Sequence, residues 1–195
     1  MMDRVLVIGC SGAGKSTVSR ELGQILGIEV FHLDKLLWKP GCNLTDPADE
    51  AAVLREVLDR PRWILDGNYA ASLPMRLKAA DTVIVVDFHR FRCLAGALKR
   101  LARFRGRNRP DMGGGCEEQL NLAFLKWIWD YPRKERPHIL HDVRHHGAHT
   151  HVVFLQKPPD VERFLTEARK SKGQHRDGGA DPAVLRASTV HPAPR

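Results

Sequence analysis

Residues 8–17 have the sequence IGCSGAGKST, and this stretch decides the fold. It contains the pattern G-x-x-x-x-G-K-[ST] from Gly9 to Ser16, follows the short apolar run 4–8, and opens a segment, 15–26, with apolar residues at helical spacing. A glycine loop in this context offers backbone N–H groups to a phosphate, and the helix start adds the positive end of its dipole. The sequence therefore predicts a phosphate-binding loop between a strand and a helix.

The residue types in the loop predict a nucleoside triphosphate as ligand, and we expect ATP with Mg²⁺. Lys15 supplies a positive charge for the β- and γ-phosphates, and Ser16 supplies a hydroxyl ligand for Mg²⁺. The predicted phosphate-binding residues are Gly9, Ser11, Gly12, Ala13, Gly14, Lys15, Ser16 and Thr17.

Short apolar runs alternate with amphipathic stretches along the rest of the chain. This alternation predicts an α/β fold, a parallel sheet covered by helices on both faces. All strands of such a sheet end at one edge, and that edge is where ligands bind. The predicted strands are 4–8, 29–33, 62–65, 82–88 and 151–155, and the predicted helices are 15–26, 46–59, one around 94–101, 117–130, 132–146 and 160–170.

Three aspartates stand at the ends of predicted strands, and two of them are candidates for chemistry. Asp66 and Asp34 could each hold the Mg²⁺ water shell or accept a proton from an attacking hydroxyl. The alternative for each is a loop cap or a partner for a nearby lysine, and spacing alone does not assign the two roles. For Asp87 we favour a structural role.

The net charge of +8 is concentrated between Asp87 and Asp111, where basic residues occur without any acidic one. Arg100, Arg103 and Arg107 lie three and four residues apart, so they share one face if the helix persists. We expect a basic flap over the phosphate loop that neutralises charge on a transferred phosphoryl group. The alternatives are binding of a nucleic-acid backbone and a solvated basic face.

Bulk properties narrow the class of protein. No apolar run approaches the roughly 20 residues that a membrane span needs, and we expect a cytoplasmic protein that has no membrane partner. The four cysteines lack disulfide-framework and zinc-site spacing. Residues 171–195 are rich in Gly, Pro, His and Arg, which predicts a disordered tail.

Four segments together resemble bacterial proteins labelled DNA topology modulation protein (FlaR-like), which are similar to adenylate kinase and other nucleoside monophosphate kinases. The resemblance covers roughly residues 3–168. It implies a three-layer P-loop NTPase fold with a five-stranded parallel sheet in one domain, 1–170, with a substrate flap at 35–62 and a lid-like segment at 100–116. The four segments are IGCSGAGKST at 8–17, FHLDKLLWKPG at 31–41, WILDGNY at 63–69 and RGRNRPDMGGGC at 105–116.

The resemblance also implies roles for single residues. Asp34 sits where shikimate- and gluconate-type kinases carry an aspartate that orients the acceptor hydroxyl. Asp66 occupies the place of the acidic strand-end motif of adenylate kinases, and we therefore assign the metal to Asp66 together with Ser16. Lys157 and Pro158 fall where adenylate kinases wrap the adenine. The monophosphate-binding arginine of that motif is missing here, and Arg76 is the nearby candidate to replace it.

These observations predict an ATP-dependent kinase. Lys15, Asp34, Arg100 and Arg103 are its expected catalytic residues, and Arg107 is expected to contact the nucleotide. The acceptor is a nucleotide or another small molecule with a hydroxyl or phosphate group. A nucleotide-dependent DNA- or RNA-binding regulator and a 5′-hydroxyl polynucleotide kinase are the two alternatives.

Overall fold

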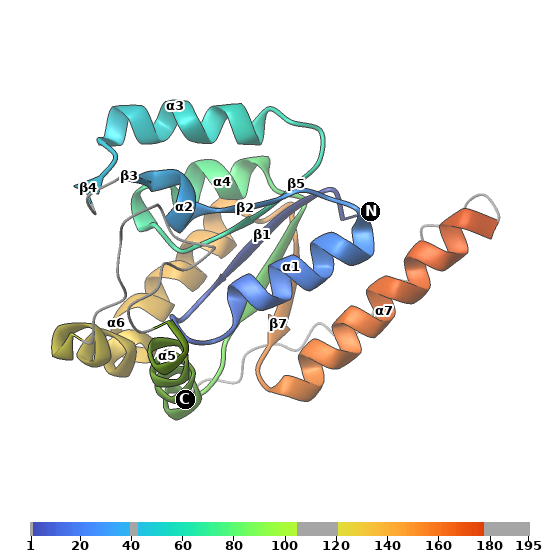
Figure 1. The fold of residues 1–195 in the computed structure, drawn as a ribbon. Coiled ribbons are helices and arrows are strands. Elements are labelled where there is room, and N and C mark those ends of the chain that lie inside the picture. The colour runs from blue at the N-terminus through green and yellow to red at the C-terminus, as the bar shows by residue number, and fades with distance from the viewer. Residues whose placement is uncertain (1, 40–42, 105–120, 178–195) are drawn as a thin grey trace.

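The computed structural model describes residues 2–39, 43–104 and 121–177 (Figure 1). The predicted five-stranded parallel sheet is confirmed, with the strand order β2-β5-β1-β6-β7. Every pair of neighbouring strands in it is parallel. The strands are β1 (Arg4–Gly9), β2 (Val30–His32), β5 (Trp63–Asp66), β6 (Thr82–Val86) and β7 (His151–Leu155).

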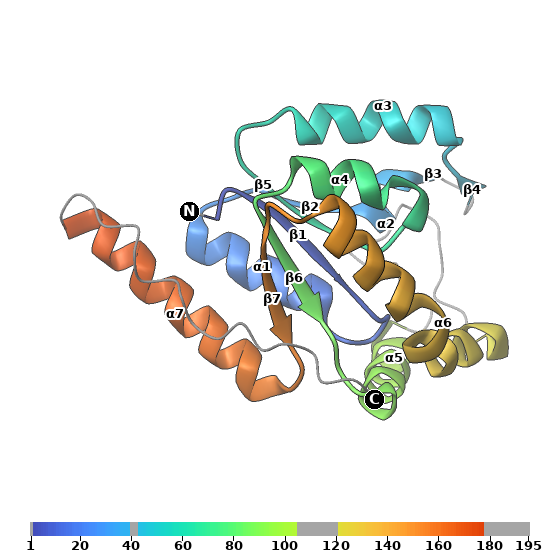
Figure 2. The same ribbon diagram turned by 180° about the vertical axis from the view of Figure 1, so that it is seen from behind.

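Helices cover both faces of the sheet, so the molecule has three layers (Figures 1 and 2). One face carries α1 (Lys15–Leu26) and α7 (Pro158–Asp177), which pack on each other. The other face carries α4 (Leu73–Ala79) and α6 (Leu122–His146), which are also in contact. Coverage on both sides explains why Val5, Leu6, Val7 and Ile8 of β1 are all fully buried and all apolar.

The remaining elements lie in two connections. Between β2 and β5 the chain forms α2 (Leu33–Leu37), a small antiparallel hairpin and α3 (Pro47–Leu58). The hairpin strands are β3 (Trp38–Lys39) and β4 (Asn43–Leu44). After β6 the chain forms α5 (Arg90–Phe104), which packs on α6 near the carboxyl end of β1. A short 3₁₀ turn, Ala70–Ser72, precedes α4.

The two helices predicted at 117–130 and 132–146 form one continuous helix, α6. Helix α6 runs through the predicted boundary and contains Pro132 and Pro137. A proline inside a helix removes a backbone hydrogen bond, and for this reason a break was predicted at Pro132. Tertiary packing outweighs that loss, because α6 lies against α4 and α5 and buries Ile128, Tyr131, Ile139 and Val143.

Other boundaries also differ from the prediction. The second strand ends at His32, so Leu33 and Asp34 belong to α2 rather than to the strand. Helix α4 was not predicted. Helix α7 continues to Asp177, inside the segment predicted as a tail, and residues 178–195 lie outside the described residues. In the described ranges, no helix combines the length and apolar character needed to cross a membrane.

Candidate functional site

The glycine loop joins β1 to α1, as its motif requires. Gly14 is the N-cap of α1, has a φ of 93°, and leaves the helix start without a side-chain cap. The N–H groups of an uncapped first turn favour an anion, and so does the helix dipole. Inside the loop, the Ala13 N–H and the Lys15 ammonium both donate to the Cys10 carbonyl, at 3.3 and 3.1 Å.

The same loop lies directly against α5. A Cβ at Gly12 would stand 2.1 Å from the Cys93 carbonyl oxygen, and a Cβ at Gly96 would stand 2.1 Å from the Gly12 carbonyl oxygen. Real Cβ atoms do not approach backbone this closely, so both positions require glycine. The G-x-x-x-x-G-K pattern does not demand a glycine at position 12. The contact therefore serves to bring α5 over the phosphate loop.

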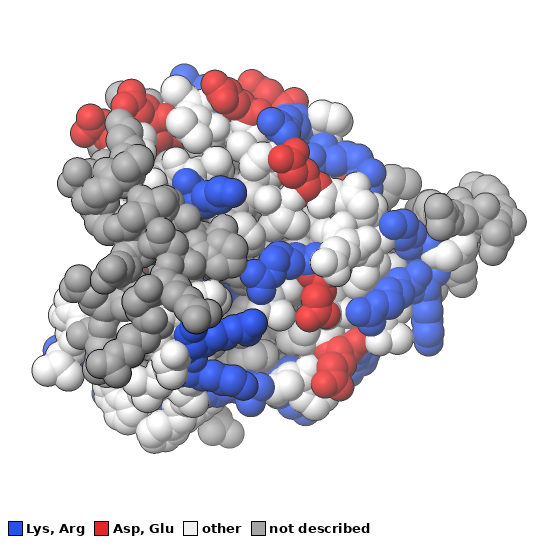
Figure 3. Space-filling view, viewed as in Figure 1, with Lys and Arg blue, Asp and Glu red and all other residues white. Residues whose placement is uncertain are grey.

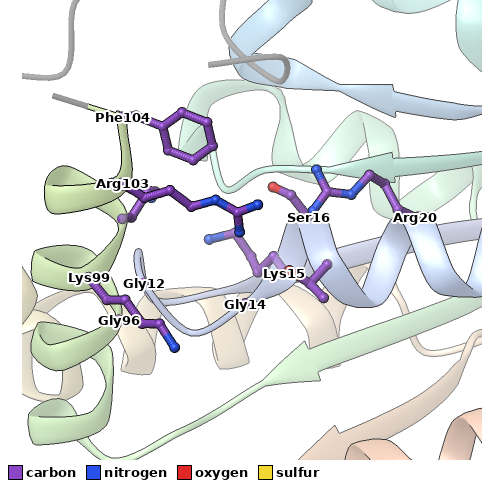
Figure 4. A pocket seen from close by; sticks show the side chains of 11 residues that line it. Gly12, Gly14, Lys15, Ser16, Arg20, Gly96, Lys99, Arg103 and Phe104 are labelled. Carbon is purple, nitrogen blue, oxygen red and sulfur yellow. The ribbon is translucent and has the colours of Figure 1, made fainter. Parts of the chain in front are cut away.

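The loop and α5 enclose a cavity of about 550 Å³ (Figure 4). Five cationic side chains line it, and no acidic residue of the described chain does. In Figure 4, Arg103 reaches from α5 toward the start of α1. Such a cavity suits a polyanion. Its lining residues are Gly12, Gly14, Lys15, Ser16, Thr17, Arg20, Gly96, Lys99, Arg100, Arg103 and Phe104.

The cavity thus brings together predicted residues from two distant segments, Lys15 and Ser16 with Arg100 and Arg103. Two of its cations were not predicted. Arg20 lies four residues after Ser16, so the helical period places it on the same side of α1. That spacing is a sequence signal that could have identified it. Lys99 directly precedes Arg100, and no spacing argument separated it from its basic neighbours.

Arg100 connects three elements. Its Nη1 donates to the Ser11 hydroxyl at 3.4 Å, and its guanidinium carbon lies 5.9 Å from the centre of the Phe124 ring on α6. These contacts set the guanidinium beside the phosphate loop. It is placed to move onto a phosphate oxygen.

Lys15 is electrostatically coupled to both candidate carboxylates. Burial lowers the pKa of its ammonium from the ordinary value, while the charges of Asp66 and Asp34 oppose that shift. Arg100 adds a smaller effect in the same direction as burial. Lys15 is therefore one of the cations that line the cavity, and it also lies within electrostatic range of two carboxylates.

Asp66 ends β5, and its side chain is buried, with 4% of the residue exposed. His32 Nδ1 lies 2.9 Å from Asp66 Oδ1, whereas Oδ2 is buried and has no hydrogen-bond partner among the residues that the structure describes. A buried carboxylate oxygen without a partner is costly, and a hydrated Mg²⁺ bound near Lys15 and Ser16 would satisfy it. The residues present therefore fit this metal.

His32 was not predicted as part of the site. It ends β2, and the parallel register of β2 on β5 sets His32 opposite Asp66. The sequence places His32 near the end of one predicted strand and Asp66 directly after another. It does not show that these two strands are neighbours in the sheet.

The loop after Asp66 is fixed to the phosphate loop. The side-chain amide of Asn68 accepts from the Gly9 N–H at 3.0 Å and donates to the Gly9 carbonyl at 2.9 Å. This pair of bonds holds the ends of β1 and β5 together. The DGNY segment is thus part of the architecture of the site.

Arg76 does not replace the missing monophosphate-binding arginine. It is fully buried, with 0% of the residue exposed, and its guanidinium donates to the carbonyls of Gly67, Asn68 and Tyr69. Burial lowers its pKa to about 10. The prediction is wrong because the side chain points into the core, where it holds the loop, and cannot reach a ligand.

Asp34 occupies the first turn of α2 and belongs to a hydrogen-bonded chain with two aromatic residues. The Tyr69 hydroxyl donates to Asp34 Oδ1 at 2.9 Å, and the Trp38 indole N–H donates to the Tyr69 oxygen at 2.8 Å. Tyr69 was not singled out from the sequence, because nothing local shows that it faces Asp34.

Other predicted residues fall elsewhere. Lys157 lies between β7 and α7, and Pro158 is the first residue of α7. Neither lines the cavity, and the Lys157 N–H donates to Asp160 at 3.1 Å. Arg107 lies outside the described residues. Asp87 has the structural role favoured for it, since Arg136 binds both of its carboxylate oxygens at 2.8 to 3.0 Å.

Comparison with known proteins identifies the fold. No model of a known protein family and no curated protein matches the chain. Among solved structures, it is similar to the shikimate kinase from Acinetobacter baumannii in complex with shikimate, at a TM-score of 0.54 and 17% identity, covering 91% of this chain and 97% of that one. It is also similar to a putative kinase from Chloroflexus aurantiacus, at a TM-score of 0.51 and 14% identity, covering 87% and 98%.

These likenesses show that the chain has the fold of the small P-loop kinases, as the sequence predicted. At such low identity they show the fold alone. The resemblance to DNA topology modulation proteins stays a prediction.

Proposed function

We propose that this protein is an ATP-dependent phosphotransferase that transfers the γ-phosphoryl group of ATP to a hydroxyl group of a small acceptor. The observation that carries the proposal is that Lys15 lines a cavity with four other cations and also interacts electrostatically with two carboxylates. Two of the similar structures, a shikimate kinase in complex with shikimate and a putative kinase, belong to the same class of enzyme and support this proposal.

The cationic cavity is the proposed site of the triphosphate. The glycine-loop amides and Lys15 bind the β- and γ-phosphates, while Arg100 and Arg103 neutralise charge that develops on the transferred group. Ser16 and the unpartnered oxygen of Asp66 would hold Mg²⁺, directly or through water. When bound, that cation supplies charge neutralisation between the β- and γ-phosphate oxygens.

Asp34 is the proposed proton acceptor. The acceptor oxygen attacks the γ-phosphorus, its proton passes to the Asp34 carboxylate, and the bond from phosphorus to the β–γ bridging oxygen breaks to release ADP. Residues 35–62 form the proposed acceptor flap, and 100–116 the proposed lid. In this reaction most of the rate comes from positioning and electrostatics rather than from covalent chemistry.

The direct test is transfer of label from ATP labelled in its γ-phosphate. A panel of sugars, cyclitols, hydroxy acids, nucleosides and nucleoside monophosphates is incubated with the protein, and labelled products are separated. We expect at least one hydroxyl acceptor to be labelled, with labelling abolished in Lys15→Ala and strongly reduced in Asp34→Asn. Label transfer that persists in Lys15→Ala would refute the site.

A nucleic-acid function is the second candidate, and one surface feature favours it. Phe91 and Trp129 are 62% and 41% exposed, their rings meet edge to face at 5.4 Å, and the Arg90 guanidinium lies 4.8 Å from the Trp129 ring centre. Exposed aromatic rings beside cations can stack on single-stranded bases. A 5′-hydroxyl oligonucleotide belongs in the labelling panel, and a steep salt dependence of its binding would favour this candidate.

A further inference from the structure

A hydrogen-bonded chain runs from the flap to the proposed proton acceptor. Trp38 donates to Tyr69 at 2.8 Å, and Tyr69 donates to Asp34 at 2.9 Å. We propose that Tyr69 is a positioning residue, which holds the Asp34 carboxylate at a fixed place relative to the phosphate loop. The proposal rests on the proposed function, in which Asp34 receives the acceptor proton.

The donor and acceptor of each hydrogen bond in this series follow from the chemistry of the side chains. An indole nitrogen can only donate, and a phenol has a single proton. Because the Tyr69 oxygen accepts from Trp38, the Tyr69 proton is directed to Asp34. Trp38 thereby orients the hydroxyl, and Asp34 receives a donor in a defined direction.

The phenol stays protonated in this environment. Burial raises the pKa of Tyr69 above its ordinary value, and the charge of Asp34 and the hydrogen bond to it raise it further. A group that does not ionise near neutral pH remains a donor throughout the working range. It cannot act as a competing base beside Asp34.

The backbone at Tyr69 is strained and tightly held. Its φ is 33°, in the left-handed region that residues other than glycine rarely adopt. The Tyr69 carbonyl accepts from Arg76 at 2.7 Å and from the Ser72 hydroxyl at 3.3 Å. Strain of this kind persists only where the surroundings enforce it, and it occurs most often at functional sites.

The same loop reaches the phosphate side of the site. Asn68, the residue before Tyr69, exchanges two hydrogen bonds with Gly9 at the start of the phosphate loop. Two adjacent residues therefore contact the phosphate loop and the acceptor carboxylate. Because Asn68 and Tyr69 are covalently linked, they fix the distance between the phosphate loop and Asp34. Catalysis by proximity depends on that distance.

The first test is a double-mutant cycle. The rate is the release of inorganic phosphate from ATP, with water as the acceptor and no other compound added. We expect Tyr69→Phe to lower kcat by about tenfold to a hundredfold, as for a lost hydrogen bond to a charged group, with the KM for ATP unchanged. Trp38→Phe is expected to cause a smaller loss.

The decisive comparison is Tyr69→Phe in the Asp34→Asn background. If Tyr69 acts through Asp34, Tyr69→Phe causes no further loss of rate once Asp34 is already replaced. The losses caused by the two substitutions are therefore expected to be strongly non-additive. A purely structural role of Tyr69 would lower the rate by the same factor in both backgrounds. That result, or an unchanged rate in Tyr69→Phe, overturns the proposal.

The second test needs no turnover. The chain has two tyrosines, so a Tyr131→Phe variant leaves Tyr69 as the sole phenol. Its ionisation is followed by the ultraviolet absorbance of tyrosinate. Adding Asp34→Asn is expected to move the titration to lower pH, because a charge and a hydrogen bond that disfavour tyrosinate are lost.

An unmoved titration contradicts the contact between Tyr69 and Asp34. Absence of label transfer from ATP to every acceptor of the panel contradicts the proposed function, and the titration still decides the contact in that case. The two failures are therefore distinguishable.

Discussion

The two sides of the site are built in opposite ways. The phosphate side is a cavity lined by cations, where the hydrogen bond from Arg100 on α5 to Ser11 in the loop is 3.4 Å long. The acceptor side carries two separate sets of short hydrogen bonds, from Trp38 through Tyr69 to Asp34 and between His32 and Asp66, with lengths of 2.8 to 2.9 Å. Figure 3 shows a similar contrast on the surface, since acidic side chains gather over α3 while Lys and Arg gather toward α5.

The contrast has a physical reason. A triphosphate brings its own charge, so the phosphate side needs positive groups that can rearrange onto it. A neutral hydroxyl brings little binding energy, so the group that takes its proton must be in place beforehand. We therefore expect substitutions on the phosphate side to weaken nucleotide binding as well as turnover, and substitutions around Asp34 to lower kcat alone.

The largest effect is expected from Lys15→Ala. It removes the ammonium that contacts the Cys10 carbonyl and faces both carboxylates. Turnover of ATP is expected to fall at least about a hundredfold, because a positioned charge at the developing anion is lost. Steady-state phosphate release measures it. A loss below about threefold is incompatible with the role given to Lys15.

The next effect is expected from Arg103→Ala. Its side chain lines the cavity, and kcat is expected to fall by about tenfold to a hundredfold. The matched control is Arg92→Ala on the same helix, since Arg92 lies over the Phe88 ring and does not line the cavity. Equal losses in the two variants would mean that the charge of α5 acts generally and not through this position.

A smaller effect is expected from Asp66→Asn. One oxygen that would hold the Mg²⁺ water shell becomes a neutral amide group, so more Mg²⁺ is needed for half-maximal turnover, by about tenfold. A titration of turnover with Mg²⁺ measures it. The control is Asp59→Asn, at the exposed C-cap of α3. An unchanged Mg²⁺ requirement in Asp66→Asn removes Asp66 from the metal site.

The smallest effect is expected on stability. In Gly96→Ala the new Cβ meets the Gly12 carbonyl oxygen at 2.1 Å, which is expected to lower the free energy of unfolding by about 1 to 3 kcal/mol. Gly173→Ala is the control, because its Cβ meets nothing within 4 Å and a helical Gly→Ala stabilises by about 0.5 to 1 kcal/mol. Urea denaturation measures both. A stable Gly96→Ala variant would show that α5 can separate from the loop.

The parts of this site that were predictable carry local signals. The strand, the glycine loop and α1 are encoded within one contiguous segment, and each apolar run of the sheet is recognisable by itself. Lys15, Asp34 and Asp66 could be proposed because each follows a strand. Local pattern was sufficient for all of these.

The parts that were missed depend on which elements are neighbours. His32 meets Asp66 because β2 pairs with β5, and Arg76 turns inward because the loop after β5 needs donors for three carbonyls. The close approach of Gly12 and Gly96 joins residues 84 positions apart. No periodicity contains such information, which arises only when the sheet and helices assemble.

The central claim is that the cavity under α5 binds the triphosphate of ATP. Calorimetric titration with a non-hydrolysable ATP analogue and Mg²⁺ tests it most directly, with AMP as the comparison ligand. We expect the analogue to bind with a Kd below about 1 mM, the Lys15→Ala variant to bind it at least about tenfold more weakly, and AMP to bind more weakly than the analogue. Absence of binding heat for the analogue, or equal affinity for AMP, contradicts the claim.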